Sequence, residues 1–329
     1  MRKRSHKSLY IALALLLAVT VVLLLRKAAP PEAARLLPES DAIVYLQLKT
    51  LRAVTHYDAS PVVRSTDYQH FIDATGIVPE RDIDSVAFAL HRMPDPRGPN
   101  GPVAYSEVFV GRFDGIKLGH YLASIASAHE SYAGHDIYTI PVDGRQLRVA
   151  QLGYDTLAAS NMPTAEQIHS MLDRHASSAL WTPGSSLLAA RYTEVPLLSQ
   201  AWAIGHIGLP FLQDGHITVL GLELPLTGDT DLVASLRYSG SVHLRVEEIA
   251  PTEDVAHHTV DTMNGLLGFL RGLQSAQPAR TPPEQAIRAV IDSVELEQHK
   301  DRAILSAVAT TDQLRELAST PAATSSQSK

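Results

Sequence analysis

One uninterrupted apolar run near the start of the chain constrains this protein more than any other feature. Residues Ser8–Leu25, SLYIALALLLAVTVVLLL, carry no charge and are mostly Leu, Ala and Val. As an α-helix rising 1.5 Å per residue, a run of this length spans roughly 27 Å, close to the thickness of a bilayer core. The run predicts one transmembrane helix, so the rest of the chain is expected to fold outside the bilayer core.

The flanks of this run decide between a retained anchor and a cleaved signal peptide. The apolar region of a signal peptide is usually about 7–15 residues and ends at a small-residue cleavage site. Here Arg26 and Lys27 follow the run, and Pro30 and Pro31 come shortly after. These charges and prolines make a poor cleavage site. We therefore expect an uncleaved signal-anchor, with a cleaved signal peptide as the alternative.

Charge on either side of the run predicts its orientation. Basic residues are more numerous before the run, where they are Arg2, Lys3, Arg4 and Lys7, than after it, where they are Arg26, Lys27 and Arg35. Positive flanks tend to stay cytoplasmic. We expect a single-pass membrane protein with a cytoplasmic N-terminus and an exported folded region.

Composition excludes several classes of function. The 329-residue chain has a net charge of -7, from 35 acidic and 28 basic residues. Nucleic-acid binding is not expected, because it needs a basic surface. The chain has no cysteine, which excludes thiol catalysis, disulfides, cysteine-ligated zinc and iron–sulfur clusters. No nucleotide-binding glycine motif is present, and we expect no cofactor.

Hydrophobic periodicity predicts an α+β fold with antiparallel sheets and helices packed on one face. The chain divides into a basic stub and anchor at 1–27, a Pro/Ala linker at 28–37, a first half at 38–184, a second half at 185–319 and a disordered tail at 320–329. In this scheme the two halves are α+β units of similar pattern.

The first half is expected to hold strands at 42–48, 85–90 and 105–111, three short strands within 135–160, and a helix within 62–75 that ends at Gly76. Asp114 is expected to cap a helix whose core stripe is Leu118, Leu122 and Ile125, and Thr164 with Gln167 to form a capping box.

The second half is expected to hold strands at 186–192, 241–248, 293–299 and 303–309, a helix at 194–204, and a strand pair at 216–224 and 230–238. Thr252 should cap a long helix with the apolar stripe Val255, Met263, Leu266, Leu270 and Leu273. A helix follows near 286–291, and Thr310 with Gln313 should form a capping box at the last helix.

The two halves share a weak internal similarity of pattern. The segment FVGRFDGIKLGHYLASIA, followed by PTAEQIHSML, runs parallel to LRVEEIAPTEDVAHHTVDTM, followed by TTDQLREL. Duplication of one unit would produce this arrangement. The alternative is that capped αβ segments look alike in unrelated chains.

Several stretches resemble an uncharacterised family of bacterial single-span envelope proteins with a domain of unknown function. They are PESDAIVYLQLKTL, VFVGRFDGIKL, the pattern Y-x-G-H-D-I-Y and the terminal TTDQLREL. The resemblance covers most of the predicted exported region. It implies an envelope location, in a bacterial inner membrane with the folded region in the periplasm or another extracytoplasmic compartment. It also implies an α+β fold, and it brings no catalytic residues.

Candidate metal ligands occur in the stretch DVAHHTVD. On a helix, Asp254, His258 and Asp261 lie on one face, because residues three and four apart are neighbours. Such a face could bind a divalent ion, although a solvated helix flank explains the same residues and is the preferred interpretation. His129 and His135, which flank a turn, are weaker candidates.

Other chemical motifs give little support for catalysis. There is no G-x-S-x-G elbow, and a dispersed Ser/His/Asp site has no local signature. Glu247 and Glu248 should point to opposite faces of a strand as solvated charges near its end. Gly265, Gly268 and Gly272 favour close packing of their helix on a sheet, with helix dimerisation as the alternative.

Two classes of function remain from the sequence. The first is a non-enzymatic binding or structural envelope protein whose partner is a protein, a lipid or a glycan. The second is an exported hydrolase with a dispersed active site. The anchor, together with many amphipathic elements, favours the first class.

Overall fold

A computed structural model describes residues 29–55, 64–98, 100–177, 184–206, 212–213, 216–219, 222–224, 230–276 and 279–318. The predicted anchor Ser8–Leu25 and the predicted tail at 320–329 lie outside these residues. Within the described part, no helix is both long enough and apolar enough to cross a membrane.

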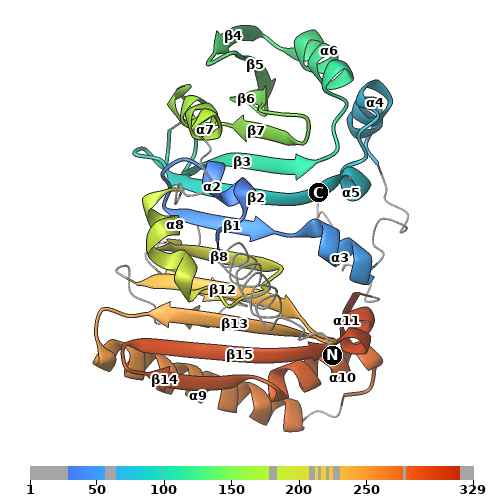
Figure 1. Ribbon diagram of the computed structural model, residues 1–329. Helices are drawn as coiled ribbons and strands as arrows, with labels where there is room; N and C mark the ends of the chain where they lie inside the picture. Colours follow the sequence, from blue (N-terminus) through green and yellow to red (C-terminus); the bar gives the residue numbers. More distant parts are fainter. Residues whose placement is uncertain are drawn as a thin grey trace, which may run out of the picture.

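The described strands form one large antiparallel sheet and one small one (Figure 1). The large sheet has twelve strands in the order β14-β15-β13-β12-β8-β1-β2-β3-β7-β6-β5-β4. Its strands are β1 (Ala42–Leu46), β2 (Ile83–Arg92), β3 (Val103–Gly111), β4 (Ala128–Tyr132), β5 (His135–Val142), β6 (Arg145–Gln151), β7 (Thr156–Ser160), β8 (Ala201–His206), β12 (Asp231–Tyr238), β13 (Ser241–Ile249), β14 (Glu295–His299) and β15 (Arg302–Thr310). The small sheet joins β9 (Leu212–Gln213), β10 (His216–Val219) and β11 (Leu222–Leu224).

Helices connect and cover these strands. They are α2 (Glu32–Leu36), α3 (Leu48–Thr55), α4 (Thr66–Thr75), α5 (Pro79–Asp82), α6 (Gly115–Ile125), α7 (Glu166–Ala176), α8 (Ser186–Arg191), α9 (Glu253–Ala276), α10 (Pro282–Asp292) and α11 (Thr311–Ala318), with the 3₁₀ helix η2 (Tyr192–Glu194).

The helices lie on both faces of the large sheet, so the expectation of one covered face is wrong. Neighbouring strand residues alternate between faces. Ala158 belongs to the core cluster that includes residues of α2, α7 and α8, whereas Ala159 belongs to the cluster that holds Leu118 and Leu122 of α6. Strand β7 is therefore apolar on both sides.

The segment expected to be a linker at 28–37 is described from residue 29 onward, and its residues 33, 34, 36 and 37 are part of the core. Its helix α2 packs on β2, β3 and α7. Ala34 and Leu37 are fully buried there, and Ala33 and Leu36 nearly so. Alanine and leucine favour helix, and the short side chains let the helix approach the sheet closely. In Figure 1, α2 lies in front of the central strands.

Many expected elements are confirmed. The strand pair β2·β3, the three short strands β5, β6 and β7, and the helices α4, α6, α9, α10 and α11 lie where the pattern places them. The Asp114 side chain accepts a hydrogen bond from the amide of Lys117, and Gly76 ends α4 with a φ of 73°. The Thr310–Gln313 capping box is present, with Gln313 N to Thr310 Oγ1 at 3.3 Å.

Other expectations are wrong around residues 186–204. The stretch SLLAARY forms α8, because the Ser185 hydroxyl caps the amide of Leu188 and Leu, Ala and Arg are good helix formers. The expected helix at 194–204 is η2, a turn and strand β8. Burial of Trp202 and Ile204 between β1 and β12 overrides their local preference.

Strand pairing and helix faces also differ in places. Strand β12 pairs with β8 and β13 instead of with 216–224. Strand β4 and helix α3 were not expected. At the start of α7, where a Thr164–Gln167 capping box was expected, the N-cap residue is Ala165 and no side chain caps the helix. Ile125 and Leu273 are exposed. The buried residues of α9 are Ala256, Thr259, Val260 and Leu267.

Candidate functional site

A groove beside helix α6 has room for a small ligand. It consists of two adjoining cavities of about 370 and 390 Å³ that share Asp136 and Tyr138 of β5. Small residues of α6 and its C-cap form one wall, namely Gly115, Gly119, Ala123 and the C-cap residue Ala126. A Cβ at Gly119 would meet only the Tyr138 hydroxyl, at 4.0 Å. The absence of side chains there leaves the groove open.

Polar and aromatic side chains line the opposite wall. His129 Nε2 lies 3.1 Å from Asp136 Oδ1, and the His129 ring lies 5.2 Å from the Tyr138 ring. The two side chains are each about half exposed (52 % and 58 %), so the contact between them contributes little to stability. Their hydrogen-bonding atoms remain accessible from the groove.

A serine, a histidine and an aspartate meet in this groove, but the serine is turned away. Ser127 and His129 line the cavity with Asp136. The Ser127 hydroxyl donates to the backbone carbonyl of Thr139 at 3.1 Å. A nucleophilic serine needs its hydroxyl hydrogen-bonded to the base. This arrangement therefore does not form a catalytic triad.

The far end of the groove carries further hydrogen-bonding groups. His135 Nδ1 donates to the backbone carbonyl of Gln151 at 2.9 Å, which fixes the tautomer of the neutral ring. Gln151 Nε2 donates to the carbonyl of Gly153. Tyr154, which is 94 % exposed, stands at the rim. Rings together with amide, imidazole and carboxylate groups suit an elongated polar ligand with apolar faces.

Two carboxyl groups of the sheet are held in apolar surroundings. Burial raises the pKa of Glu107 on β3 to about 7. Burial also raises the pKa of Glu248 on β13, and the neighbouring Thr259 hydroxyl partly offsets the increase. Neither carboxyl oxygen of Glu248 has a hydrogen-bond partner among the described residues. Both groups are accordingly stabilised in the protonated form.

Glu247 and Glu248 point to opposite faces as expected, but both are buried, so their interpretation as solvated charges is wrong. Glu247 Oε2 accepts from Arg245 at 2.8 Å, and its other oxygen accepts from Arg302. Arg302 also binds Glu194 of η2 at 2.7 Å. These bonds raise the pKa of Arg302 and lower that of Glu194. The cluster ties η2 to β13 and β15.

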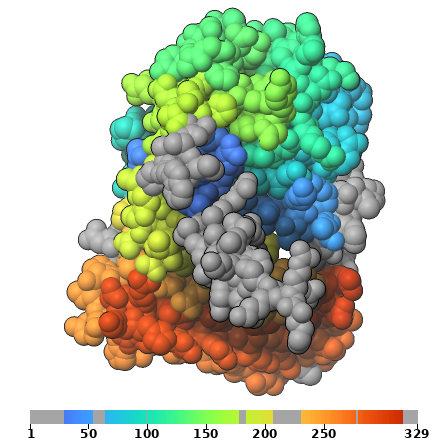
Figure 2. Space-filling model, viewed as in Figure 1, coloured from blue at the N-terminus to red at the C-terminus, as the bar shows by residue number. Residues whose placement is uncertain are grey.

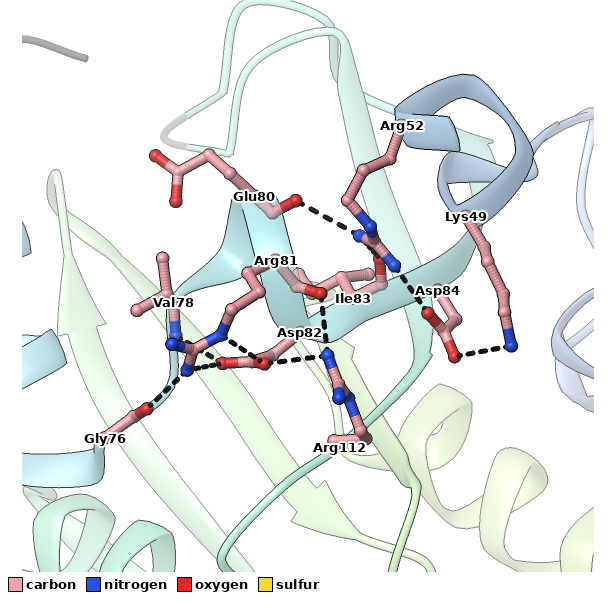
Figure 3. A network of polar contacts seen from close by, with 10 residues as sticks. All are labelled: Lys49, Arg52, Gly76, Val78, Glu80, Arg81, Asp82, Ile83, Asp84 and Arg112. Atoms are coloured by element: carbon pink, nitrogen blue, oxygen red, sulfur yellow. Dashed lines mark hydrogen bonds and ion pairs between the residues drawn. The ribbon is translucent and has the colours of Figure 1, made fainter. Parts of the chain in front are cut away.

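A second network joins α3, α5 and the ends of β2 and β3 (Figure 3). Asp82 accepts from Arg81 at 2.7 Å, from Arg112 at 3.2 Å and from the amide of Val78 at 2.9 Å. The bond to Arg81 is the main reason that the pKa of Asp82 is lowered. Arg52 of α3 binds Asp84 at 2.7 Å. In both cases basic and acidic groups satisfy one another and fix the elements that carry them.

The candidate metal ligands do not assemble into a site. His257, next to the candidates Asp254 and His258, lies 3.3 Å from Asp261 and binds Gln298 of β14 through its other ring nitrogen. Among the described residues, no group of three or more His, Asp or Glu side chains could hold a metal ion. The helix face is exposed at all three candidates.

The expected packing of Gly265, Gly268 and Gly272 on the sheet is also wrong. A Cβ at any of these positions would meet nothing within 4 Å. The three glycines lie on the outer side of α9.

The sequence indicated His129 and His135 only as weak metal-ligand candidates that flank a turn, and it did not predict the groove. The available signal was the stretch HDIY, whose alternation places Asp136 and Tyr138 on one side of β5 and Ile137 in the core. The glycine and alanine residues of α6 at spacings of three and four were a second signal. Neither reveals that α6 crosses this part of the sheet.

Comparisons with known proteins identify no family. No protein-family model matches the chain, and no curated protein matches it. Among solved structures, three crystal forms of TP0453 are similar in shape. Form IV has a TM-score of 0.46 at 12 % identity, form III 0.47 at 11 % and form I 0.45 at 12 %. These alignments cover 88 %, 88 % and 89 % of this chain and 98 % of TP0453 in each case. Likeness at this level carries no argument about function.

Proposed function

We propose that this protein is a membrane-tethered, exported body that binds or organises another envelope component without catalysing a reaction. One observation carries the proposal. Only residues 26–28 separate the apolar run from Ala29, where the described chain begins, and α2 is seated in the core from Glu32 onward. Four peptide steps from Leu25 to Ala29 reach at most about 14 Å. A helix anchored in the bilayer would therefore hold the body directly at the membrane surface.

The groove beside α6 supports the binding part of this proposal. We assign to it a glycan ligand, because sugar rings present apolar faces to Tyr138 and Tyr154 and hydroxyl groups to His129 and Asp136. An open groove with few charges suits such a ligand better than a folded protein partner.

A hydrolase is the less favoured function. Ser127, His129 and Asp136 are the residues that such an enzyme would use in the groove. The hydrogen bond from Ser127 to the carbonyl of Thr139 points the hydroxyl away from the histidine. Binding needs no nucleophile, so the observed geometry favours it.

We also propose that the body consists of two similar halves. The strand orders β1-β2-β3-β7-β6 and β8-β12-β13-β15-β14 support this. In both, a first strand is followed by a hairpin, β2-β3 or β12-β13, that leads into a helical segment. A later hairpin, β6-β7 or β14-β15, then pairs its second strand with the third strand of the half, with β4 and β5 as an addition in the first half. The antiparallel pairing of β1 with β8 would join the halves at the middle of the sheet.

The glycan assignment is tested by cosedimentation of the detergent-solubilised full chain with insoluble bacterial cell-wall glycan. The variant Gly119→Leu fills the groove. Its matched control is Gly268→Leu, also at a helical glycine, whose Cβ would meet nothing within 4 Å. We expect the control to bind like the unmodified protein and Gly119→Leu to lose at least fivefold in affinity. Equal binding by both variants, or no binding by the unmodified protein, contradicts the assignment.

A further inference from the structure

A tight turn between η2 and β8 presents two leucines to solvent. In the turn Pro196–Ser199, the amide of Ser199 donates to the carbonyl of Pro196 at 3.3 Å, and its hydroxyl donates to the same oxygen at 2.7 Å. Leu197 and Leu198 occupy the two central positions and are 62 % and 65 % exposed. Leu198 has a φ of 66°, a conformation that favours glycine at this position of a turn.

The base of this turn is held firmly by the sheet. Gln200 donates its amide to the carbonyl of Leu236 at 2.9 Å, and its own carbonyl accepts from the amide of Gln47 at 2.7 Å. Its side chain accepts from the amide of Tyr238 at 2.6 Å. The backbone therefore fixes the position of the leucines, even though burial does not stabilise their side chains.

The surroundings of the turn mix apolar, basic and acidic groups. Helix α3 begins directly after Gln47 and carries Leu51, which is half exposed. It also carries Lys49, whose side chain is mostly exposed and lies 3.8 Å from Asp84. Arg237, which precedes Tyr238 on β12, is exposed as well. Leucines flanked by lysine and arginine match the boundary between acyl chains and anionic headgroups.

The turn follows, a few residues later in sequence, a residue that contacts the point where the described chain begins. The hydroxyl of Tyr192, the first residue of η2, donates to the carbonyl of Ala29 at 3.4 Å. Only the rest of η2 and Val195 separate Tyr192 from the turn. In Figure 2, the segment before β1 (blue) and the segment around α8 and η2 (yellow-green) lie on the same face of the molecule.

We propose that the Leu197–Leu198 turn inserts into the headgroup region of the bilayer that holds residues 8–25, and so fixes the orientation of the body on the membrane. The inference rests on the proposed function, because it requires the apolar run to be a membrane anchor. The occupant of this surface is lipid. Insertion into lipid gives a role to the strained backbone of Leu198 and to the two exposed leucine side chains, a role that folding of the body does not give them.

The test uses the absence of cysteine from the chain, which makes any introduced cysteine the only site for a spin label. The full chain is reconstituted at low density into phosphatidylethanolamine–phosphatidylglycerol vesicles. Three variants are labelled: Leu197→Cys at the turn, Val142→Cys at an exposed position six strands away from β8, and Val21→Cys within the apolar run. Collisions with oxygen, which concentrates in lipid, and with a water-soluble nickel chelate report the surroundings of each label.

We expect the label at residue 197 to show at least a threefold higher oxygen-to-nickel ratio than the label at residue 142. A ratio equal to that at residue 142, while the label at residue 21 reports lipid, overturns this inference and leaves the anchor intact. A water-exposed label at residue 21 overturns the proposed function itself. Low collision rates with both reagents at residue 197 indicate a protein contact and also overturn the inference. The variant Leu197→Trp, quenched by brominated lipid, gives an independent second readout.

Discussion

At the scale of single residues, Glu107 shows how burial controls a charge in this sheet. It lies on β3 between Phe88 of β2 and Ala159 of β7, and burial raises its pKa to about 7. In the unfolded chain its pKa is about 4.3. The folded protein therefore binds the proton more tightly. The resulting stability is fully present below about pH 4.3 and is lost as pH rises through about 7.

The variant Glu107→Gln should remove this contribution and keep the shape of the side chain. From pH 5 to pH 8 the unmodified protein should lose about 2 kcal/mol of unfolding free energy more than the variant does, after allowance for partial exposure. Chemical denaturation of the full chain in detergent at both pH values measures this difference. Glu295→Gln, at an exposed strand residue, serves as the control. Equal pH dependence in the unmodified protein and Glu107→Gln contradicts the account.

Leu198 provides a test of backbone strain. A leucine in the left-handed region costs roughly 1–2 kcal/mol, which glycine avoids, although glycine adds about 0.5–1 kcal/mol of unfolded-state entropy. Leu198→Gly should therefore leave stability unchanged or raise it by up to about 1 kcal/mol. Leu197→Gly, at a position outside the positive-φ set, should lower stability by about 0.5–1 kcal/mol. Thermal melting of both variants measures the contrast, and a larger loss for Leu198→Gly would refute it.

The pair Glu247 and Glu248 shows what sequence could predict at this scale. Alternation along a strand correctly placed the two side chains on opposite faces. It could not show that both faces are covered, because η2 and α9 come from other parts of the chain. Burial of the pair is a property of the assembled sheet.

At the scale of elements, Arg302 joins η2 to two strands of the sheet. It bridges Glu194 and the buried Glu247. Arg302→Met leaves a buried carboxylate with one fewer cation and should lower unfolding free energy by about 3 kcal/mol. The double variant Arg302→Met with Glu247→Gln should recover at least about 1 kcal/mol of that loss. Denaturation of the unmodified protein, the two single variants Arg302→Met and Glu247→Gln, and the double variant gives the coupling between the two positions. Additive losses contradict the role of the bridge.

Helix α2 provides a second test at this scale. Leu37, which follows its last turn, is fully buried. Leu37→Ala should cost about 2–5 kcal/mol, as expected for a buried leucine. Leu197→Ala, at the exposed turn, should cost less than about 0.5 kcal/mol. Melting temperatures of the full chain distinguish the two. A small effect at Leu37 would mean that 28–37 behaves as the linker expected from its composition.

Local signals determined some elements and not others. Caps such as Asp114 and Thr252 predicted helix starts correctly, because a cap is a contact between neighbours in sequence. The stretch at 194–204 was assigned to a helix, yet Ala201–His206 is a strand in the middle of the sheet. Its conformation depends on pairing with β1 and β12, which are distant in sequence.

At the scale of the whole molecule, one sheet of twelve strands spans both predicted halves. The α+β class with antiparallel sheets is confirmed. It could be predicted from the sequence because amphipathic periodicity is a local signal. The groove beside α6 was not predicted, since it depends on how a helix crosses strands that follow it in the chain. The short connection between the apolar run and α2 makes membrane attachment the central claim at this scale.

The most direct test of that claim is alkaline carbonate extraction of membranes, followed by N-terminal sequencing of the recovered protein. The account predicts that the protein stays in the membrane pellet and begins at residue 1 or 2. Release into the supernatant, with a new N-terminus after Lys27, would contradict it and would make the apolar run a cleaved signal peptide.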